Sequence, residues 1–366
     1  MAAPMSFIDA RPPPARRPDA RSWLRENLFS SAGSTLATLL FAALLSWAAA
    51  VVLGWAVVHA VWVADADECQ AARGIGACWG VIAEKGRLIL LGRYPADESW
   101  RPVTATVLLL GLVVASCNRR FWNSWLALLW PAVSALYLWL MGGGAGLSRV
   151  ATDLWGGLPL TVMLTVASLA LAFPLAIVIA LGRRSTMPAV RTLCIAYVEL
   201  VRGVPLISVL FMASFMFPLF VPPGHSPDVL VRVVIGITLF AAAYMAEIVR
   251  GGLQSVPRGQ VEAAASIGLT WWQAQRKIVL PQALAAVVPP IVNNFISLFK
   301  DTSLVTIVSL YELTGALSLA LDSDPNWRPF KAEGYLFIAA IYFGFCFAMS
   351  RYSLRLEQRL ARSHGR

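Results

Sequence analysis

The chain has 366 residues, of which 58% are hydrophobic and only 14% are charged, and its mean hydropathy is +0.66. Soluble domains carry about 25% charged residues, so this composition excludes an ordinary soluble protein and predicts a polytopic membrane protein. A net charge of +10 would suggest nucleic-acid binding in a soluble protein. In a membrane protein the positive-inside rule explains the same excess, and we expect no nucleic-acid partner.

Residues 1–34 are polar and rich in Pro and Arg, which predicts a disordered or loosely ordered cytoplasmic tail. The apolar run Thr35–Ala60 follows this tail. It is too long for the hydrophobic region of a cleaved signal peptide, so we expect it to be the first transmembrane helix. The basic residues that precede it are Arg11, Arg16, Arg17, Arg21 and Arg25.

The next segment, residues 61–101, is mixed in charge and contains Cys69 and Cys78. If the first helix starts inside the cell, this segment is a periplasmic loop. The periplasm is oxidising, so the two thiols can form a disulfide there. Two unpaired thiols are an equally open alternative. Within the loop, Val81–Gly92 is expected to form a short helix on the membrane surface.

Two shorter apolar runs, Pro102–Cys117 and Trp125–Leu140, come next. Each is shorter than the about 20 residues that a spanning helix usually needs. Arg119 and its basic neighbour separate the runs, which predicts a helical hairpin with a cytoplasmic turn. A Gly-rich break at Gly142–Gly146 places a domain boundary near residue 150. Residues 35–150 are thus an N-terminal extension with three transmembrane helices.

Residues 151–366 contain five further apolar runs and are predicted to form the core. The fourth run is interrupted by a polar group at residues 300–303, and a basic tail closes the fifth. The expected fold class is an all-α polytopic membrane protein with about eight transmembrane helices. The core runs are Leu158–Leu181, Leu193–Phe220, Val231–Val249, Leu284–Leu298 with its continuation to Leu310, and Leu336–Met349.

The distribution of basic residues orients these spans. With the N-terminus inside, the loops that hold Arg119, Arg183 and Arg276 and the basic C-terminal tail all face the cytoplasm, as the positive-inside rule requires. The long loop at residues 61–101 counts little in this rule. Both termini are therefore expected in the cytoplasm, together with the loop at residues 255–282.

The loop at residues 255–282 is a polar island between two apolar runs. Good helix formers from Glu262 to Ile267 predict a short helix, and Gly268 allows a turn or a helix C-cap. An amphipathic piece with Trp271 and Trp272 follows. A rigid knob of this kind suits docking to another protein, and an ordinary interhelical loop is the alternative.

This knob resembles the EAA loop of the membrane permease subunits of ATP-binding-cassette (ABC) importers. That motif consists of EAA, three residues, Gly, nine residues, Ile, one residue and Leu-Pro. In that family the loop is the coupling helix that sits in a groove of the ATPase. The resemblance implies that Glu262 is the docking contact and Gly268 the turn. The matching positions are Glu262, Ala263, Ala264, Gly268, Ile278, Leu280 and Pro281.

Three more segments resemble permeases for polar amino acids, the histidine/glutamate/glutamine family. They are Tyr197–Leu206, Ala243–Gln254 and Phe299–Leu304. With the EAA loop they cover about residues 158–355 and imply a five-helix core of the type I ABC-importer permease in a bacterial inner membrane. The extra N-terminal spans make the chain similar to one subunit of the general L-amino acid importer of Gram-negative bacteria.

Several ionisable residues lie inside the core spans, where they are costly and point to function. Glu199 and Arg202 are three residues apart and are expected to pair, and Glu247 and Arg250 repeat that spacing. Snorkelling with purely structural pairing remains the alternative. Residues 202–205 predict a kink, because Pro lacks an amide donor, and the kink is either a gate or a packing feature. The structural or gating candidates are Glu199, Arg202, Gly203, Pro205, Glu247 and Arg250.

The densest polar group within an apolar run lies in the fourth core span. Asn293, Ser297 and Lys300 share one helical face. If it looks into the bundle, this face would bind the α-amino and α-carboxylate groups of an amino acid. Alternatively, Lys300 and Asp301 lie at the outer interface and cap the helix. The candidates for the substrate path are Asn293, Asn294, Ser297, Lys300, Asp301, Thr302 and Ser303.

The sequence contains neither a G-x-x-x-x-G-K-[ST] phosphate loop nor an H-E-x-x-H motif, and its three histidines are far apart. We therefore expect no catalytic residue, no cofactor and no metal site. The resemblance implies a permease subunit of an ATP-driven importer of L-amino acids. The implied partners are a cytoplasmic ATPase dimer, a second homologous permease, more readily as a heterodimer than a homodimer, a periplasmic amino-acid-binding protein and membrane lipid.

Two other classes compete with this interpretation. A stand-alone secondary amino acid transporter or channel would account for eight spans with membrane carboxylates, but not for a complete EAA loop. An internal inverted repeat would favour it, and none is evident in the sequence. A membrane-embedded enzyme would need a nucleophile or a metal cluster within the spans, and the sequence shows neither.

Overall fold

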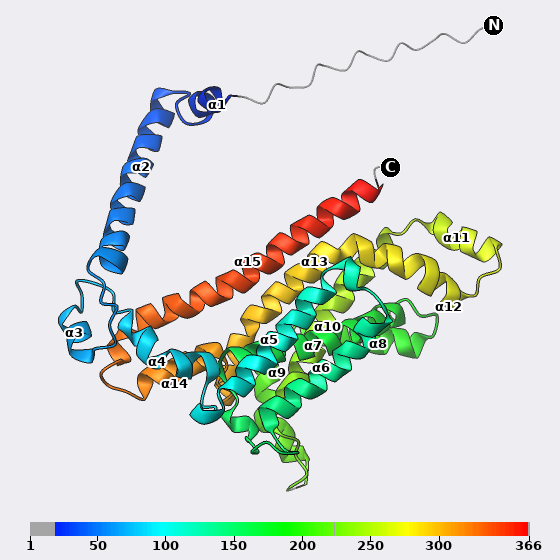
Figure 1. Ribbon diagram of the computed structural model, residues 1–366. Coiled ribbons are helices and arrows are strands. Elements are labelled where there is room, and N and C mark those ends of the chain that lie inside the picture. Colours follow the sequence, from blue (N-terminus) through cyan, green and yellow to red (C-terminus); the bar gives the residue numbers. More distant parts are fainter. Residues whose placement is uncertain (1–18, 223, 365–366) are drawn as a thin grey trace. The chain divides into compact units, whose positions relative to one another are not determined.

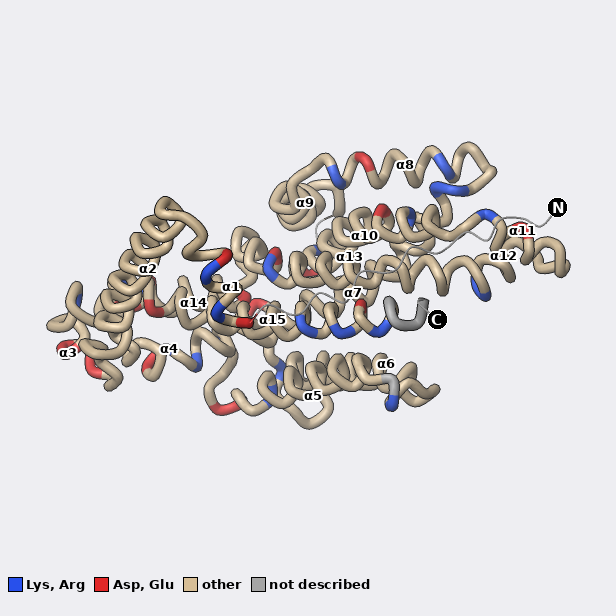
Figure 2. The backbone as a smooth tube through the Cα atoms, turned by 90° about the horizontal axis from the view of Figure 1, so that it is seen from above, with Lys and Arg blue, Asp and Glu red and all other residues tan. Residues whose placement is uncertain are grey.

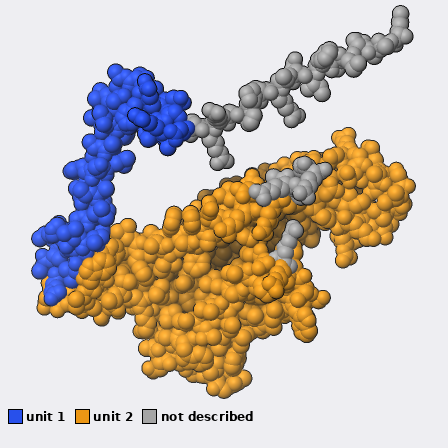
Figure 3. Space-filling model, turned by 45° about the horizontal axis from the view of Figure 1, so that its top comes forward, with its two compact units in different colours: residues 1–61, 68–78 blue, residues 62–67, 79–366 orange. Residues whose placement is uncertain are grey.

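The computed structural model describes residues 19–222 and 224–364, and these ranges are built almost entirely of helices (Figure 1). Within these ranges, seven helical runs are long and apolar enough to cross a membrane, or eight if one bent pair counts as a single span. The expected all-α polytopic class with about eight spans is therefore confirmed. Contacts divide the chain into two units, residues 1–61 with 68–78 and residues 62–67 with 79–366 (Figure 3).

The first unit begins with α1, Ala20–Asn27, in a region expected to lack regular structure. That expectation is wrong for these residues. The last Pro of the tail is Pro18, and a run of helix formers follows it. The expected tail at residues 1–18 lies outside the described residues. After Ser31, whose side chain accepts a hydrogen bond from the Ser34 amide, α2 spans Ala32–Leu53 and continues as a π-helical turn, Gly54–Val58.

The loop after this helix contains α3, Ala66–Ala71, and α4, Gly80–Leu91. The expected hairpin follows as α5, Trp100–Ser116, and α6, Ser124–Gly142. The α5 run gains length from a short 3₁₀ turn, so that Ala96–Ser116 has 21 residues. It is thus as long as a spanning helix needs to be, and longer than its apolar run alone predicts.

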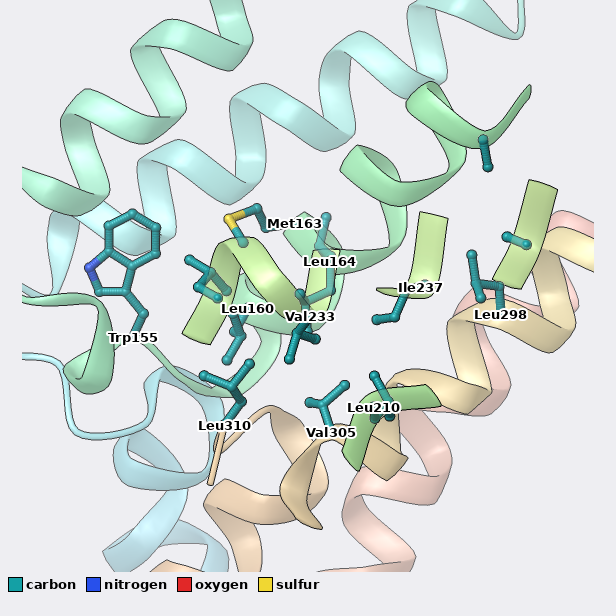
Figure 4. Packing of buried hydrophobic residues seen from close by; sticks show 14 of the residues in the cluster. Trp155, Leu160, Met163, Leu164, Leu210, Val233, Ile237, Leu298, Val305 and Leu310 are labelled. Carbon is teal, nitrogen blue, oxygen red and sulfur yellow. The ribbon is translucent and has the colours of Figure 1, made fainter. Parts of the chain in front are cut away.

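The centre of the second unit is a three-helix layer in which α10 packs against both α7 and α13. Their bounds are Gly157–Gly182 for α7, Val229–Ser255 for α10 and Leu280–Asp301 for α13. Leu160 and Leu164 of α7 meet Val233 and Ile237 of α10 in the buried cluster of Figure 4. Small residues along α10 let the backbones approach closely, as is usual between membrane helices. At Gly252 an added Cβ would lie 2.5 Å from the Ala283 carbonyl oxygen.

The predicted span Leu193–Phe220, with its kink at residues 202–205, is bent far more sharply than expected. The chain forms α8, Pro188–Arg202, and a second helical run, Leu206–Phe220, bent by 103° relative to it. This second run contains α9, Leu206–Phe211, and short π and 3₁₀ turns. The predicted kink at residues 202–205 is therefore a complete break. Pro205 cannot donate an amide hydrogen bond to α8 and instead sits at the start of α9 in an extended conformation.

The second unit ends with four helical elements after α13, one of them the short 3₁₀ turn Arg328–Phe330. The fourth core run was expected to be interrupted at Lys300–Ser303, but helical structure continues as a 3₁₀ segment, Thr302–Val308. The Thr302 hydroxyl donates to the Phe299 carbonyl at 2.7 Å and thereby satisfies its polar group within the helix. A short apolar helix, α14, Leu313–Asp322, was not predicted. The last helix, α15, spans Lys331–His364.

Candidate functional site

The polar island between α10 and α13 forms a helix, a turn and a second helix. The first helix is α11, Arg258–Ser266, and the second is α12, Trp271–Ala274. Through a π-helical segment, Gln275–Val279, α12 continues into α13. The helical run Trp271–Val308 is 38 residues long. The second piece of the knob is thus the end of a membrane span and not a separate helix.

Gly268 makes the turn between α11 and α12. Its φ is +78°, a left-handed conformation that only Gly adopts without strain, and an added Cβ would meet nothing within 4 Å. Thr270 then begins α12 with a capping box, in which its side chain accepts from the Gln273 amide and the Gln273 side chain accepts from the Thr270 amide. The T-W-W-Q pattern was a sequence signal for this helix start that the sequence analysis did not use.

The seven motif residues of the knob divide by exposure. Glu262, Ala263, Gly268 and Pro281 are exposed, whereas Ala264 is buried and Ile278 and Leu280 are half-buried at the base of the knob. Three large apolar side chains at the tip, Ile267 at 73%, Trp271 at 56% and Trp272 at 58%, are also exposed. An exposed carboxylate beside exposed apolar groups is the composition expected of a protein-docking surface.

A second cluster surrounds Glu247 near the end of α10. The Glu247 carboxylate accepts from Arg183 at 2.7 Å and from the Arg250 Nε at 3.0 Å, and it lies 3.9 Å from the Arg202 guanidinium. The guanidinium of Arg202 also lies over the ring of Tyr244, whose hydroxyl approaches the Arg202 carbonyl at 3.5 Å. Glu247 is therefore the acceptor at which α7, α8 and α10 meet.

The expected local pair between Glu199 and Arg202 is wrong. Glu199 lies 3.2 Å from Arg183, and Arg202 faces Glu247. Arg183 lies at the end of α7, and Glu247 lies on α10. The reason is that α8 packs against α7 and α10, which bring a cation and a carboxylate closer than the neighbour three residues away. The expected pair of Glu247 with Arg250 is present.

The substrate-path candidates all lie at the end of α13 and the start of the following 3₁₀ segment. Asn293, Ser297 and Lys300 share one exposed face, as their spacing predicts. Asn294 is half-buried, and its side-chain oxygen is enclosed without a hydrogen bond from any described residue. Asp301 and Ser303 are half-buried and Thr302 is fully buried, so these three belong to the packed side of the helix.

A buried carboxylate that the sequence analysis missed lies at the start of α14. Glu312 is fully buried and accepts from the Thr314 and Gly315 amides at 2.8 and 3.1 Å. It also accepts from Thr161 of α7 at 3.2 Å and from Tyr342 of α15 at 2.8 Å. One carboxylate thus caps one helix and joins two others. An acidic residue directly before the apolar run Leu313–Leu321 was the signal for this N-cap.

The two cysteines of the outer loop are joined in the structure. Cys69 and Cys78 form a disulfide with their Cα atoms 5.4 Å apart, and both are fully buried. The loop they close packs against the end of the first membrane helix, where the Ala77 amide donates to the Trp55 carbonyl at 2.9 Å. At Gly76 an added Cβ would lie 1.8 Å from the His59 carbonyl oxygen, so the loop requires Gly at this position.

Comparison with known proteins shows which family shares this architecture. Residues 155–362 match the model of the family described as "Binding-protein-dependent transport system inner membrane component". The chain is 45% identical to the inner membrane amino-acid ABC transporter permease protein YhdY of Escherichia coli strain K12, over 95% of each chain. It is 37% identical to the glutamate/glutamine/aspartate/asparagine transport system permease protein BztC of Rhodobacter capsulatus, over 98% of each.

A solved structure shares the core. A chain of the crystal structure of an amino acid ABC transporter with histidines superposes with a TM-score of 0.50 at 30% identity. The match covers 56% of this chain and 92% of that chain. The two full-length relatives, by contrast, also cover the N-terminal part. The chain belongs to the family of inner membrane components of binding-protein-dependent transport systems.

Proposed function

We propose that this chain is the subunit through which L-amino acids cross the inner membrane in an ATP-driven importer. It is a multi-pass inner membrane permease by family. The amino acid substrate is supported by the names of both relatives that match nearly its whole length. The observation that carries the proposal is the α11–α12 knob, an exposed docking surface that follows the family's coupling motif at every position.

The knob would pass movement of the ATPase to the helices of the core. Docking of an ATPase on the exposed carboxylate of Glu262 would hold α11, and the turn at Gly268 would fix α12 relative to it. Because α12 runs without interruption into α13, movement of the knob displaces a helix that ends at Lys300 and Asp301. Closure of the ATPase dimer would thereby rock the core between inward-open and outward-open states.

A second permease subunit is part of the proposal. The face of α13 that carries Asn293, Ser297 and Lys300 is exposed on the single chain. Polar and charged groups at membrane depth need protein partners or a water-filled cavity. A homologous subunit across this face would supply both and would enclose the substrate path between the two chains. We propose a heterodimer with a different permease, fed by a periplasmic amino-acid-binding protein.

The proposed domain organisation and orientation follow from the charge distribution. Residues 1–34 would be a cytoplasmic tail, residues 35–150 an extension with a periplasmic loop at residues 61–101, and residues 151–366 the permease core. Both termini and the coupling loop at residues 255–282 would face the cytoplasm. The disulfide of Cys69 and Cys78 supports a periplasmic place for the extension's loop, because disulfides persist in that compartment.

Uptake of labelled L-amino acids tests the proposal. Cells would express the chain alone and then together with its ATPase, second permease and binding protein. We expect uptake only with all components, and the amino acid panel would name the substrates. Uptake by the chain alone would overturn the importer and point to a stand-alone transporter, with Lys300 and Asp301 as the first residues to substitute.

A point variant tests the coupling role. Gly268→Asp should leave the fold intact but lower ATPase copurification and uptake by about tenfold or more, since roughly 1.4 kcal/mol of lost docking energy gives that factor. The matched control is Gly74→Asp, because Gly74 also has a positive φ, +85°, with nothing within 4 Å of an added Cβ. A Gly268→Asp permease that copurifies and transports normally would exclude the coupling assignment.

A further inference from the structure

A basic cavity lies where the connection between α7 and α8 meets the end of α10. Its volume is about 400 Å³. Figure 2 shows basic residues at this connection. The lining consists of four arginines, an amide and one apolar side chain: Arg183, Arg184, Arg191, Arg250, Gln254 and Ile195.

The charge of the cavity is only partly balanced. Arg183 and Arg250 are neutralised by Glu247, and Arg183 also by Glu199. Arg184 donates to the Leu253 carbonyl at 3.0 Å and, like Arg191, forms no ion pair among the described residues. Two guanidinium charges, both on exposed side chains, are thus left without a carboxylate in the lining of a concave site.

The side chains that line the cavity indicate which class of ligand it can bind. A guanidinium group presents paired donors that match the oxygens of a phosphate, and the Gln254 amide adds another donor. Exposed apolar side chains lie next to the lining residues on α8, among them Leu193 at 70% exposure. A ligand that combines an anionic phosphate with an apolar body satisfies both features. The positive-inside rule accounts for the number of arginines at this membrane boundary, but not for their convergence on one cavity.

We propose that this cavity binds the phosphate headgroup of an acidic phospholipid, with the acyl chains beside α8. In the proposed orientation the cavity opens to the cytoplasmic leaflet, where basic residues at the membrane surface attract anionic lipid. The headgroup would bridge the α7–α8 connection and the end of α10, which are the elements that Glu247 already joins. The lipid would therefore hold α8 at the position where the chain bends.

Lipid retention on the assembled transporter tests this proposal. The complex of permeases and ATPase would be purified in mild detergent, exposed to equal amounts of phosphatidylglycerol and phosphatidylcholine, and analysed by native mass spectrometry. Wild type should retain phosphatidylglycerol selectively. The double variant Arg184→Gln/Arg191→Gln should lower its retention by roughly tenfold or more. Arg351→Gln/Arg355→Gln on α15, which removes the same charge from likewise exposed positions that do not line the cavity, should leave retention unchanged.

Other outcomes overturn the proposal. Equal loss in both double variants would show a general attraction of basic surface for acidic lipid. Complete displacement of the lipid by millimolar inorganic phosphate, with one phosphate retained per cavity, would assign the site to a free anion. If the glutamine variant fails to assemble, Arg184→Lys/Arg191→Lys keeps the charge but loses the paired donors. Its retention should fall several-fold, and wild-type retention would exclude recognition by guanidinium groups. Retention needs no uptake, so it does not depend on the identity of the transported substrate.

Discussion

Two helical runs of equal length differ sharply in how they are used. Ala32–Val58 and Val229–Ser255 each contain 27 residues and are apolar enough to cross a membrane. No side chain of the first is buried, whereas 13 residues of the second, between Leu230 and Leu253, are buried. In both runs, hydropathy alone predicts a membrane span. Small residues occur in both runs, so they do not explain the difference. The difference is that α7 and α13 pack against α10, which makes α10 the centre of a bundle.

The comparison separates two kinds of stability. Within the second unit, side chains and backbones from distant parts of the sequence support one another, as around Glu312 and Gly252. Within the first unit, order depends on local structure, on one covalent link and on a few backbone contacts between the disulfide loop and the end of the first membrane helix. Substitutions at four places sharpen or break this contrast, and they are arranged from the largest expected effect to the smallest.

The largest effect is expected at Glu312. Glu312→Ala removes an N-cap and takes one buried acceptor away from the hydroxyls of Thr161 and Tyr342, which should cost about 3 kcal/mol or more in unfolding free energy. Glu312→Gln keeps one carbonyl acceptor and should cost less than half as much. Unfolding of the purified protein by SDS titration measures both values. Equal stability of wild type and Glu312→Ala would contradict the role assigned to this carboxylate.

The second prediction concerns the crossing of α10 and α13. Gly252→Ala places a methyl group 2.5 Å from the Ala283 carbonyl oxygen and should destabilise the protein by about 2 kcal/mol, because this backbone contact cannot relax freely. Gly251→Ala on the same helix and Gly33→Ala in α2 meet nothing within 4 Å and should be neutral or slightly stabilising. The same titration compares the three variants. A cost at Gly33 equal to that at Gly252 would break the contrast between the two helices.

The third prediction tests the covalent link of the first unit. Replacing Cys78 by Ser opens a loop of nine-residue separation and should cost about 2 kcal/mol locally, because the unpaired chain gains conformational entropy. Trypsin cleavage at Arg73, between the two cysteines, should become faster, while SDS unfolding of the core stays unchanged. Cys117→Ser, at a free cysteine, is the control. Unchanged cleavage at Arg73 would mean that the loop is held by packing and not by the disulfide.

The smallest effect is expected at a surface ion pair. Lys85 of α4 lies 2.7 Å from Asp324 after α14, and this hydrogen bond holds the pKa of the Asp324 carboxyl below its usual value. The stabilisation is therefore present above the unfolded pKa of about 3.9 and is lost as the pH falls through the lower folded pKa. Lys85→Met should lower the melting temperature by less than ~2 °C at pH 7 and by nothing in acid. Asp324→Asn should lower the melting temperature by a similar amount. A loss of stability in either variant that grows as the pH falls would contradict the lowered pKa of Asp324.

Much of the molecule could be predicted from short stretches of sequence. The apolar runs located the spans, although several helices extend well beyond their runs, as Trp271–Val308 does, and Gly268 predicted the turn that its φ of +78° makes. The residues 202–205 predicted a kink, although not its size. These features are local, because a helix forms from bonds between residues four apart and a left-handed turn needs a single Gly.

The sequence alone therefore determined the class of the protein, the order of its spans and the short helix and turn that begin the α11–α12 knob. Only the tertiary structure decided that Glu247 joins α7, α8 and α10, that Glu199 faces Arg183, and that α8 and α9 differ in direction by 103°. It also decided that Glu312 is buried among three helices and that four arginines converge on one cavity. The physical reason is that these contacts join residues far apart in the chain. Their geometry depends on how helices of similar hydropathy pack, and hydropathy does not specify that packing.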